Sequence, residues 1–219
     1  MYYLNILKLK KLNHLQIKEP YILSALNATS ITCLLSNILS SNRLPYFFWI
    51  DGIGARLITL RGKRIPGRNL LNNSLLNFSK NHVPFDIIGD LNNNSVNFLN
   101  NLDLKYNHIE VPIADAKSIA KIASKQIKFS HVILLLPSPK QELVSEILFV
   151  IKPAKYLCFG GALNMLSGNE IPAPSLIHFL GIEFLWRLQN DSLRRILRIL
   201  SILQHIFKFR RRNFRCKFY

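Results

Sequence analysis

Residues 131–136 read His-Val-Ile-Leu-Leu-Leu, so apolar residues follow one another without a break from Val132 to Leu136. Such a run fits a strand that is buried on both faces, as the strands of parallel sheets are. Pro137-Ser138-Pro139 comes next, and a segment with the apolar spacing of a helix, Gln141–Val150, follows it. A strand that leads through a short turn into a helix is the repeating unit of α/β folds.

The same alternation extends in both directions from this unit. Further candidate strands are Tyr21–Leu26, Tyr46–Asp51, Phe85–Gly89, Tyr106–Val111 and Tyr156–Gly160. Further candidate helices are Thr29–Ser40, Leu70–Lys80, Ser95–Leu102 and Ala116–Gln126. The asparagine-rich stretch Leu91–Leu102 fits either a loop or a polar helix. The pattern predicts an α/β fold with a mostly parallel, doubly wound (Rossmann-like) sheet.

Polar or glycine residues follow several of these strands. They are Asn27, Asp51, Asp90, the Pro139–Glu142 turn and Gly160-Gly161. Ligands of open α/β sheets bind beyond the carboxyl ends of the strands. We therefore expect these groups to lie along one rim of the sheet.

The composition indicates an anionic partner. The chain has 219 residues, 49% of them hydrophobic, and a formal net charge of +17. This length fits one domain with a substantial core, and the charge favours nucleic acid, acidic lipid or a phosphorylated substrate. Three scattered cysteines and six dispersed histidines form no metal-ligand motif and indicate free thiols in a reducing compartment.

The C-terminal segment carries much of this charge. Residues 194–219 contain nine Lys or Arg and no acidic residue. One helical face would hold Leu193, Ile196, Leu197, Leu200, Leu203 and Phe207, and the other Arg194, Arg195, Arg198, Ser201, His205 and Lys208. An apolar face beside cations suits an acidic membrane surface. We expect an α/β domain over 1–191 and a basic amphipathic membrane-binding appendage over 192–219.

No secretory signal and no apolar run long enough to cross a bilayer is apparent in the sequence. We therefore expect a cytoplasmic protein that is peripheral on the inner face of the membrane.

Three blocks of sequence resemble the WecG/TagA/CpsF family of glycosyltransferases. The first is Asp51-Gly52-Ile53-Gly54 with Arg64-Ile65-Pro66-Gly67 and Leu70, the second is Pro139-Lys140-Gln141-Glu142, and the third runs from Gly160-Gly161 through Ala173-Pro174 to Gly181–Leu188. With Asn27, the resemblance extends from about Ser24 to Arg195. The order and separation of the blocks make it specific.

The resemblance implies an inverting, metal-independent enzyme without a cofactor. Its donor would be a UDP-sugar, carrying N-acetylmannosamine, its uronic acid or a related sugar. Its acceptor would be a sugar linked to undecaprenyl diphosphate at the membrane, in the synthesis of a cell-surface polysaccharide. The sequence decides neither the sugar nor the pathway nor whether the chain forms a homo-oligomer.

Asp51 is the candidate general base for the acceptor hydroxyl. It ends an aromatic strand, and Gly52 and Gly54 leave room for a sugar. An Asp-Gly pair is also a common turn. The surrounding family pattern favours the catalytic interpretation.

Arginines are the candidates for binding the donor diphosphate, because the sequence has no D-x-D metal motif. Arg64 is the first choice, and Arg187 or Arg194 would assist from the C-terminal segment. Isolated arginines in a basic protein are mostly solvated, so the choice of Arg64 depends on its place in the motif.

Gln141, Glu142 and Asn27 are further candidates for substrate binding. The start of the helix at Gln141 attracts anions, and the Gln141 amide can orient a sugar or phosphate oxygen. Glu142 fits a charge at a helix start equally well, and Asn27 fits the cap of the helix that begins near Thr29.

The chain departs from the family pattern at several positions. The family has a threonine where this chain has Ala25, aspartates at Asn69 and Asn164, a glycine at Asp90 and an arginine at Pro172. These departures leave open a catalytically weakened paralogue that acts as a membrane scaffold. A nucleic-acid-binding protein is the other alternative, but the basic residues lie beside a full apolar face that nucleic acid does not require, and no nucleic-acid-binding motif is found.

Overall fold

The computed structural model of the chain describes residues 2–7, 17–40, 43–51, 55, 59, 63–170 and 214–219. The strands are β1 (Tyr2–Ile6), β2 (Tyr21–Leu26), β3 (Tyr46–Ile50), β4 (Phe85–Ile88), β5 (Tyr106–Ile109), β6 (His131–Leu134), β7 (Lys155–Cys158) and β8 (Phe214–Phe218). The helices are α2 (Ala28–Leu35), α4 (Gly67–Lys80), α5 (Asn93–Asn101), α6 (Ala116–Ser124), α7 (Lys140–Ile151) and α8 (Ala162–Leu166).

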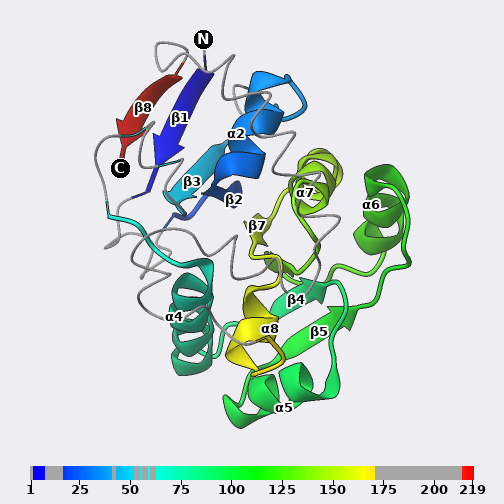
Figure 1. The fold of residues 1–219 in the computed structure, drawn as a ribbon. Helices are drawn as coiled ribbons and strands as arrows, with labels where there is room; N and C mark the ends of the chain where they lie inside the picture. Colours follow the sequence, from blue (N-terminus) through cyan, green and yellow to red (C-terminus); the bar gives the residue numbers. More distant parts are fainter. Residues whose placement is uncertain are drawn as a thin grey trace.

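The strands form one sheet in the order β5-β4-β6-β7-β2-β3-β1-β8, and all the neighbours run parallel. The predicted α/β class with a parallel sheet is confirmed. The chain leaves β4 toward one edge to form β5 and then returns past β4 to form β6 (Figure 1).

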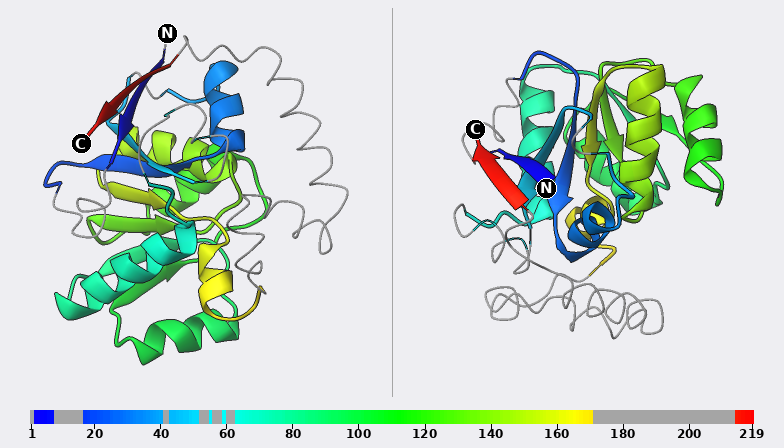
Figure 2. Two further views of the ribbon diagram at one scale, coloured as in Figure 1. Left: turned by 60° about the vertical axis from the view of Figure 1, so that its left-hand side comes forward. Right: turned by 90° about the horizontal axis from the view of Figure 1, so that it is seen from above.

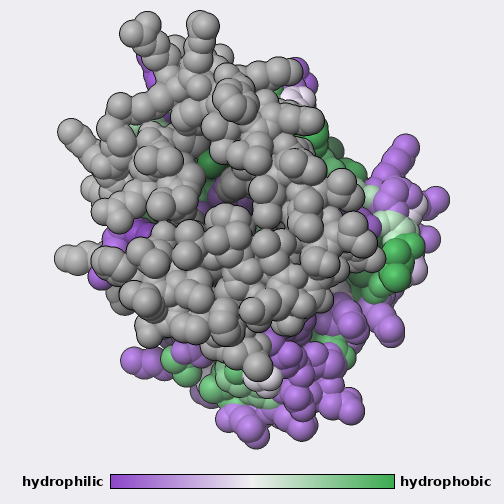
Figure 3. Space-filling view, in the orientation of Figure 1, coloured by the Kyte–Doolittle hydropathy of each residue, from purple (hydrophilic) through white to green (hydrophobic). Residues whose placement is uncertain are grey.

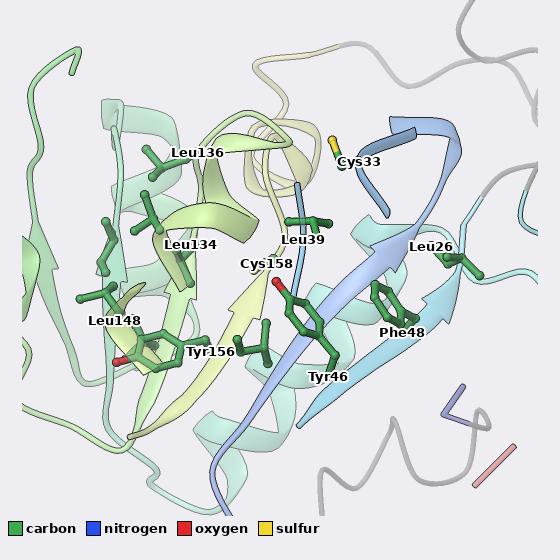
Figure 4. Packing of buried hydrophobic residues seen from close by; sticks show 14 of the residues in the cluster. Leu26, Cys33, Leu39, Tyr46, Phe48, Leu134, Leu136, Leu148, Tyr156 and Cys158 are labelled. Carbon is green, nitrogen blue, oxygen red and sulfur yellow. The ribbon is translucent and has the colours of Figure 1, made fainter. Parts of the chain in front are cut away.

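Helices cover both faces of the sheet, as the doubly wound pattern predicts. One apolar core lies under α2, α6 and α7, and the other lies under α4, α5 and α8. Figure 2 shows these two layers on opposite sides of the sheet. Figure 4 shows the first core, where side chains of the central strands meet Leu148 of α7. Burial of this much apolar surface is the main force that holds the layers together.

The asparagine-rich stretch forms a helix, α5. Its N-cap is Asn92, whose side chain accepts a hydrogen bond from the backbone N–H of Ser95. Ser95 and Leu99 face the sheet, and the asparagines face outward. The described surface is mostly hydrophilic in the region of α5 (Figure 3). Of the two alternatives for this stretch, a loop or a polar helix, the structure confirms the polar helix.

The C-terminal strand differs from the expectation of an appendage. Residues 214–218 form β8, which pairs with β1 from Tyr2↔Phe214 to Ile6↔Phe218, so this end of the chain belongs to the sheet. Phe214 is buried, whereas Arg215 and Lys217 are exposed, which is the period of two that a strand requires. Residues 192–213 of the predicted appendage lie outside the described residues. In the described part of the chain, no helix has the length and apolar character needed to cross a membrane.

Candidate active site

Asn27 and Asp51 lie side by side at the carboxyl end of the sheet. The register of β2 and β3 pairs Leu26 with Ile50, and the backbone N–H of Asp51 donates to the Leu26 carbonyl at 3.1 Å. The residues after these two strands therefore leave the sheet at the same rim. The Asp51 side chain is partly exposed.

Asn27 caps helix α2. Its Oδ1 accepts a hydrogen bond from the Ser30 N–H at 3.0 Å, and the Ser30 hydroxyl accepts one from the Asn27 N–H at 2.8 Å. This reciprocal pair satisfies two donors at the helix start. The Nδ2 group of Asn27 has no hydrogen-bond partner among the described residues. The cap thus uses the amide oxygen and does not use the amide N–H groups.

Arg64 returns to the rim after residues 52–62. The backbone N–H of Ile65 donates to the Ile50 carbonyl at 2.9 Å, which places Arg64 beside the end of β3 and near Asp51. The Arg64 side chain is partly buried. Helix α4 begins three residues later, at Gly67. The structure therefore places Asn27, Asp51 and Arg64 near one another at the rim.

Gln141 and Glu142 begin helix α7 but lie beneath the rim surface. Gln141 is 4% exposed and Glu142 is 0% exposed. Glu142 Oε1 accepts hydrogen bonds from the Ser24 hydroxyl at 2.8 Å and from Gln141 Nε2 at 3.0 Å. The Oε1 atom of Gln141 accepts from the Gly160 N–H at 2.8 Å. The protein itself uses these polar atoms.

A second buried carboxyl, that of Glu146, lies one helical turn after Glu142. Its Oε1 accepts from the Ser40 N–H at 2.7 Å. Burial raises the pKa of Glu146, and the carboxylate of Glu142 contributes in the same direction. Tyr46, whose hydroxyl points toward Cys158 (Figure 4), donates to the Glu142 carbonyl at 3.4 Å.

Cys158 lies in the same interior, behind the rim. Burial raises the pKa of the Cys158 thiol well above its ordinary value, and the Glu142 charge adds to this effect. A thiol in this environment stays protonated and unreactive. Cys158 is therefore part of the packed interior behind the site.

A family model describes the chain from residue 53 to residue 218, as the glycosyl transferase WecG/TagA/CpsF family. The chain belongs to this family of glycosyltransferases. No curated protein matches the chain in a sequence search. Arg64, Gln141 and Glu142 lie within the range matched to the WecG/TagA/CpsF model, whereas Asn27 and Asp51 precede it.

Two predicted site residues of this family member, Arg187 and Arg194, lie outside the described residues, as does Pro172. The other residues that depart from the family pattern lie within the described part of the chain. Ala25 is buried within β2, Asn69 is exposed on α4, and Asp90 is exposed after β4. Asn164 accepts a weak hydrogen bond at Oδ1 from Asn92 Nδ2 at 3.4 Å, so it ties α8 to the start of α5.

Sequence reasoning missed Ser24 as a member of the site. It is fully buried in β2 and donates to Glu142, which is distant in the sequence. The signal was a single polar residue in the otherwise apolar strand Tyr21–Leu26. Buried hydroxyls need a partner, so such a residue points to a polar group on a neighbouring element.

Within the described ranges, no three His, Cys, Asp or Glu side chains are grouped so that they could hold a metal ion. Asp51, Asn27 and Arg64 supply a carboxylate, an amide and a guanidinium beside the ends of β2 and β3. This set can accept a proton, orient a hydroxyl and bind an anion.

Proposed function

We propose that the chain is an inverting glycosyltransferase that moves a sugar from a UDP donor to a sugar linked to undecaprenyl diphosphate. The observation that carries this proposal is the placement of Asp51 beside Asn27 and Arg64 at the carboxyl ends of β2 and β3. Family membership supplies the reaction class, and the resemblance in motif supplies the donor and the acceptor.

Asp51 acts as the general base. The acceptor hydroxyl oxygen attacks the anomeric carbon of the donor sugar while the Asp51 carboxylate takes the hydroxyl proton. A bond forms between this oxygen and the anomeric carbon, and the bond from that carbon to UDP breaks. UDP leaves with the bonding electron pair. A single displacement of this kind inverts the configuration at the anomeric carbon.

Arginines stabilise the charge that grows on the leaving diphosphate. Arg64 stands at the rim next to Asp51, and a guanidinium binds phosphate oxygens through paired charge-assisted hydrogen bonds. Arg187 or Arg194 adds a second guanidinium from the C-terminal segment. The Nδ2 group of Asn27 donates to the donor. No divalent metal takes part.

The acceptor is presented at the inner face of the cytoplasmic membrane. The amphipathic stretch from about Leu193 to Phe209 binds the anionic surface through its apolar face and its neighbouring cations. Strand β8 then returns the chain to the sheet. The amphipathic stretch thus lies in the chain between α8 and β8.

A weakened paralogue that serves as a membrane scaffold is the second candidate. It is favoured by Asn164, which stands where the family pattern has an aspartate and binds Asn92. A UDP-sugar panel with purified protein and a lipid-diphosphate-GlcNAc acceptor decides between the two. Transfer from one donor, with release of UDP, supports the enzyme, and vesicle binding without transfer from any donor supports the scaffold.

A further inference from the structure

Three polar side chains lie buried behind the rim, between β2, α7 and β7. Ser24 and Glu142 are fully buried, and Gln141 is almost so. Buried polar groups cost free energy unless they are paired, so a connected set in a core needs a reason. The hydrogen bonds of this set lead from Glu142 through Gln141 to the backbone N–H of Gly160.

The hydrogen bonds of this set converge on the carboxylate of Glu142. The Ser24 hydroxyl and Gln141 Nε2 both donate to Glu142 Oε1, at 2.8 and 3.0 Å. Because Nε2 is held by Glu142, Oε1 of Gln141 is turned toward the Gly160 N–H, which donates to it at 2.8 Å. Without the carboxylate, the Gln141 amide can rotate and set its NH₂ group against the Gly160 N–H, donor against donor.

Gly160 begins the Gly160-Gly161 turn after β7. Its φ is +55°, a conformation that side chains disfavour, and a Cβ there would lie 3.4 Å from the Leu136 carbonyl oxygen. The Gly160 N–H is shared between Gln141 Oε1 and the Leu134 carbonyl at 3.1 Å. Gly161 follows and is exposed at the rim. The turn therefore lies at the carboxyl end of β7, beside β2, and the buried network lies behind it.

We propose that Glu142 is a positioning residue that acts through Gln141 to fix the Gly160-Gly161 turn as a wall of the substrate site. This inference rests on the proposed transfer reaction. It gives Gln141 and Glu142 an indirect part in substrate binding. A turn without side chains lets a sugar or phosphate approach the backbone closely, and an error of about 1 Å in such a wall costs up to roughly a hundredfold in rate.

The surroundings of the Oε2 atom of Glu142 allow a test that distinguishes a positioning role from a role for the negative charge. This atom is buried, and no hydrogen bond reaches it from the described residues. In Glu142→Gln the amide oxygen can occupy the place of Oε1 and keep both hydrogen bonds, while the NH₂ group takes the place of Oε2. In Glu142→Ala both hydrogen bonds are lost. A positioning role therefore predicts rescue by glutamine, and a role for the negative charge itself predicts none.

The test compares wild type, Glu142→Gln, Glu142→Ala, Gln141→Met and the double variant Gln141→Met/Glu142→Ala. Hydrogen exchange at the Gly160 amide and steady-state kcat and KM are measured for each. We expect faster Gly160 exchange and a lower kcat/KM, by up to about a hundredfold, in Glu142→Ala and in Gln141→Met. Glu142→Gln should retain much more of both, and the double variant should be no worse than Gln141→Met alone.

Three results would overturn the proposal. These are equal losses in Glu142→Gln and Glu142→Ala, additive losses in the double variant, or unchanged Gly160 exchange in Gln141→Met. If Glu142→Ala does not fold, Gln141→Met and Glu142→Gln carry the same comparison. Hydrogen exchange does not depend on turnover, so it separates this proposal from the proposed function. If the wild type transfers no sugar but Gly160 exchange changes among the variants as expected, the proposed function is refuted and the positioning of the turn by Glu142 stands.

Discussion

The Oδ1 atom of Asn27 accepts a hydrogen bond from the backbone N–H of Ser30 at 3.0 Å, and this bond forms half of a reciprocal cap on α2. The cap turns the amide so that Nδ2 is left for another partner at the rim. Capping and donor binding, which look like competing roles in the sequence, are thus compatible in one side chain. They use different atoms of the same amide.

Substitution at Asn27 separates the two roles. Asn27→Asp retains a good cap, whereas Asn27→Ala loses it and should lower the free energy of unfolding by about 1 kcal/mol. Both variants lose the Nδ2 donor, so both should raise KM for the UDP-sugar. Thermal unfolding and donor titration check this pair. A donor KM that rises only in Asn27→Ala would leave the residue with capping alone.

Much of the fold follows from apolar periodicity. Strand β2 has the bounds that the sequence predicts, and β6 and α7 differ from the predicted ranges by one or two residues at an end. These elements are recognisable because continuous apolar runs and helical spacing reflect burial on a parallel sheet. The rim could be predicted too, since the carboxyl ends of parallel strands share an edge.

Other features could not be predicted, for physical reasons. Helix α8 is only five residues long, so it does not repeat its apolar pattern often enough to be distinctive. Strand β8 has the alternation of a strand, but its Arg and Lys residues gave it the appearance of a basic tail. The bond from Ser24 to Glu142 joins residues far apart in sequence, and only the packing of α7 on β2 creates it.

Glu146 predicts a pH dependence of stability. Burial raises its pKa, so between the ordinary glutamate pKa and the raised one the folded state holds a proton that the unfolded state releases. This contribution to stability is present at low pH and is lost as pH rises through the raised pKa. Glu146→Gln keeps an acceptor for the Ser40 N–H without the charge. It should unfold at a higher temperature than wild type at pH 7.

The difference between Glu146→Gln and wild type should shrink as the pH falls toward the ordinary glutamate pKa. Glu110→Gln, which removes an exposed carboxylate, controls for net charge. Melting curves of the three proteins over a pH series provide the test. A Glu146→Gln variant less stable than wild type at pH 7 would mean that the carboxylate is stabilised by its partners despite its burial.

Transfer should survive chelation of divalent metals, since Arg64 and the C-terminal arginines are proposed to neutralise the diphosphate. Product formation is followed in EDTA and in added magnesium or manganese. Loss of transfer in EDTA that either metal restores would show that the diphosphate site has been assigned incorrectly. The same assay with Arg64→Lys should show weaker donor binding, because lysine lacks the paired donors of a guanidinium.

Membrane binding is best tested without truncation, because removal of the C-terminal segment would also remove β8 and the buried Phe214. The variant Arg194→Gln/Arg195→Gln/Arg198→Gln should bind anionic vesicles more weakly, since each cation near an acidic leaflet contributes about 1 kcal/mol. Part of the apolar attachment should persist at high salt. Co-sedimentation with anionic and neutral vesicles over a salt series measures both effects.

A matched control replaces three exposed lysines by glutamine, Lys117 and Lys121 on α6 and Lys125 at its C-cap. This variant has the same net charge as the arginine variant but keeps all the arginines of the C-terminal segment. It should bind vesicles nearly as wild type does. Equal weakening in the two variants would mean that total charge, and not the C-terminal segment, determines membrane binding.

The central claim is that Asp51 is the base in sugar transfer. Its backbone N–H bonds the Leu26 carbonyl in any variant, so Asp51→Asn should fold normally. Asp90, an exposed aspartate after β4 at the same rim, supplies the control Asp90→Asn. The most direct measurement is the single-turnover rate of sugar transfer to the lipid-linked acceptor with each protein at saturating donor. We predict a loss of about a hundredfold or more in Asp51→Asn and little change in Asp90→Asn. A near-normal rate in Asp51→Asn would contradict the account.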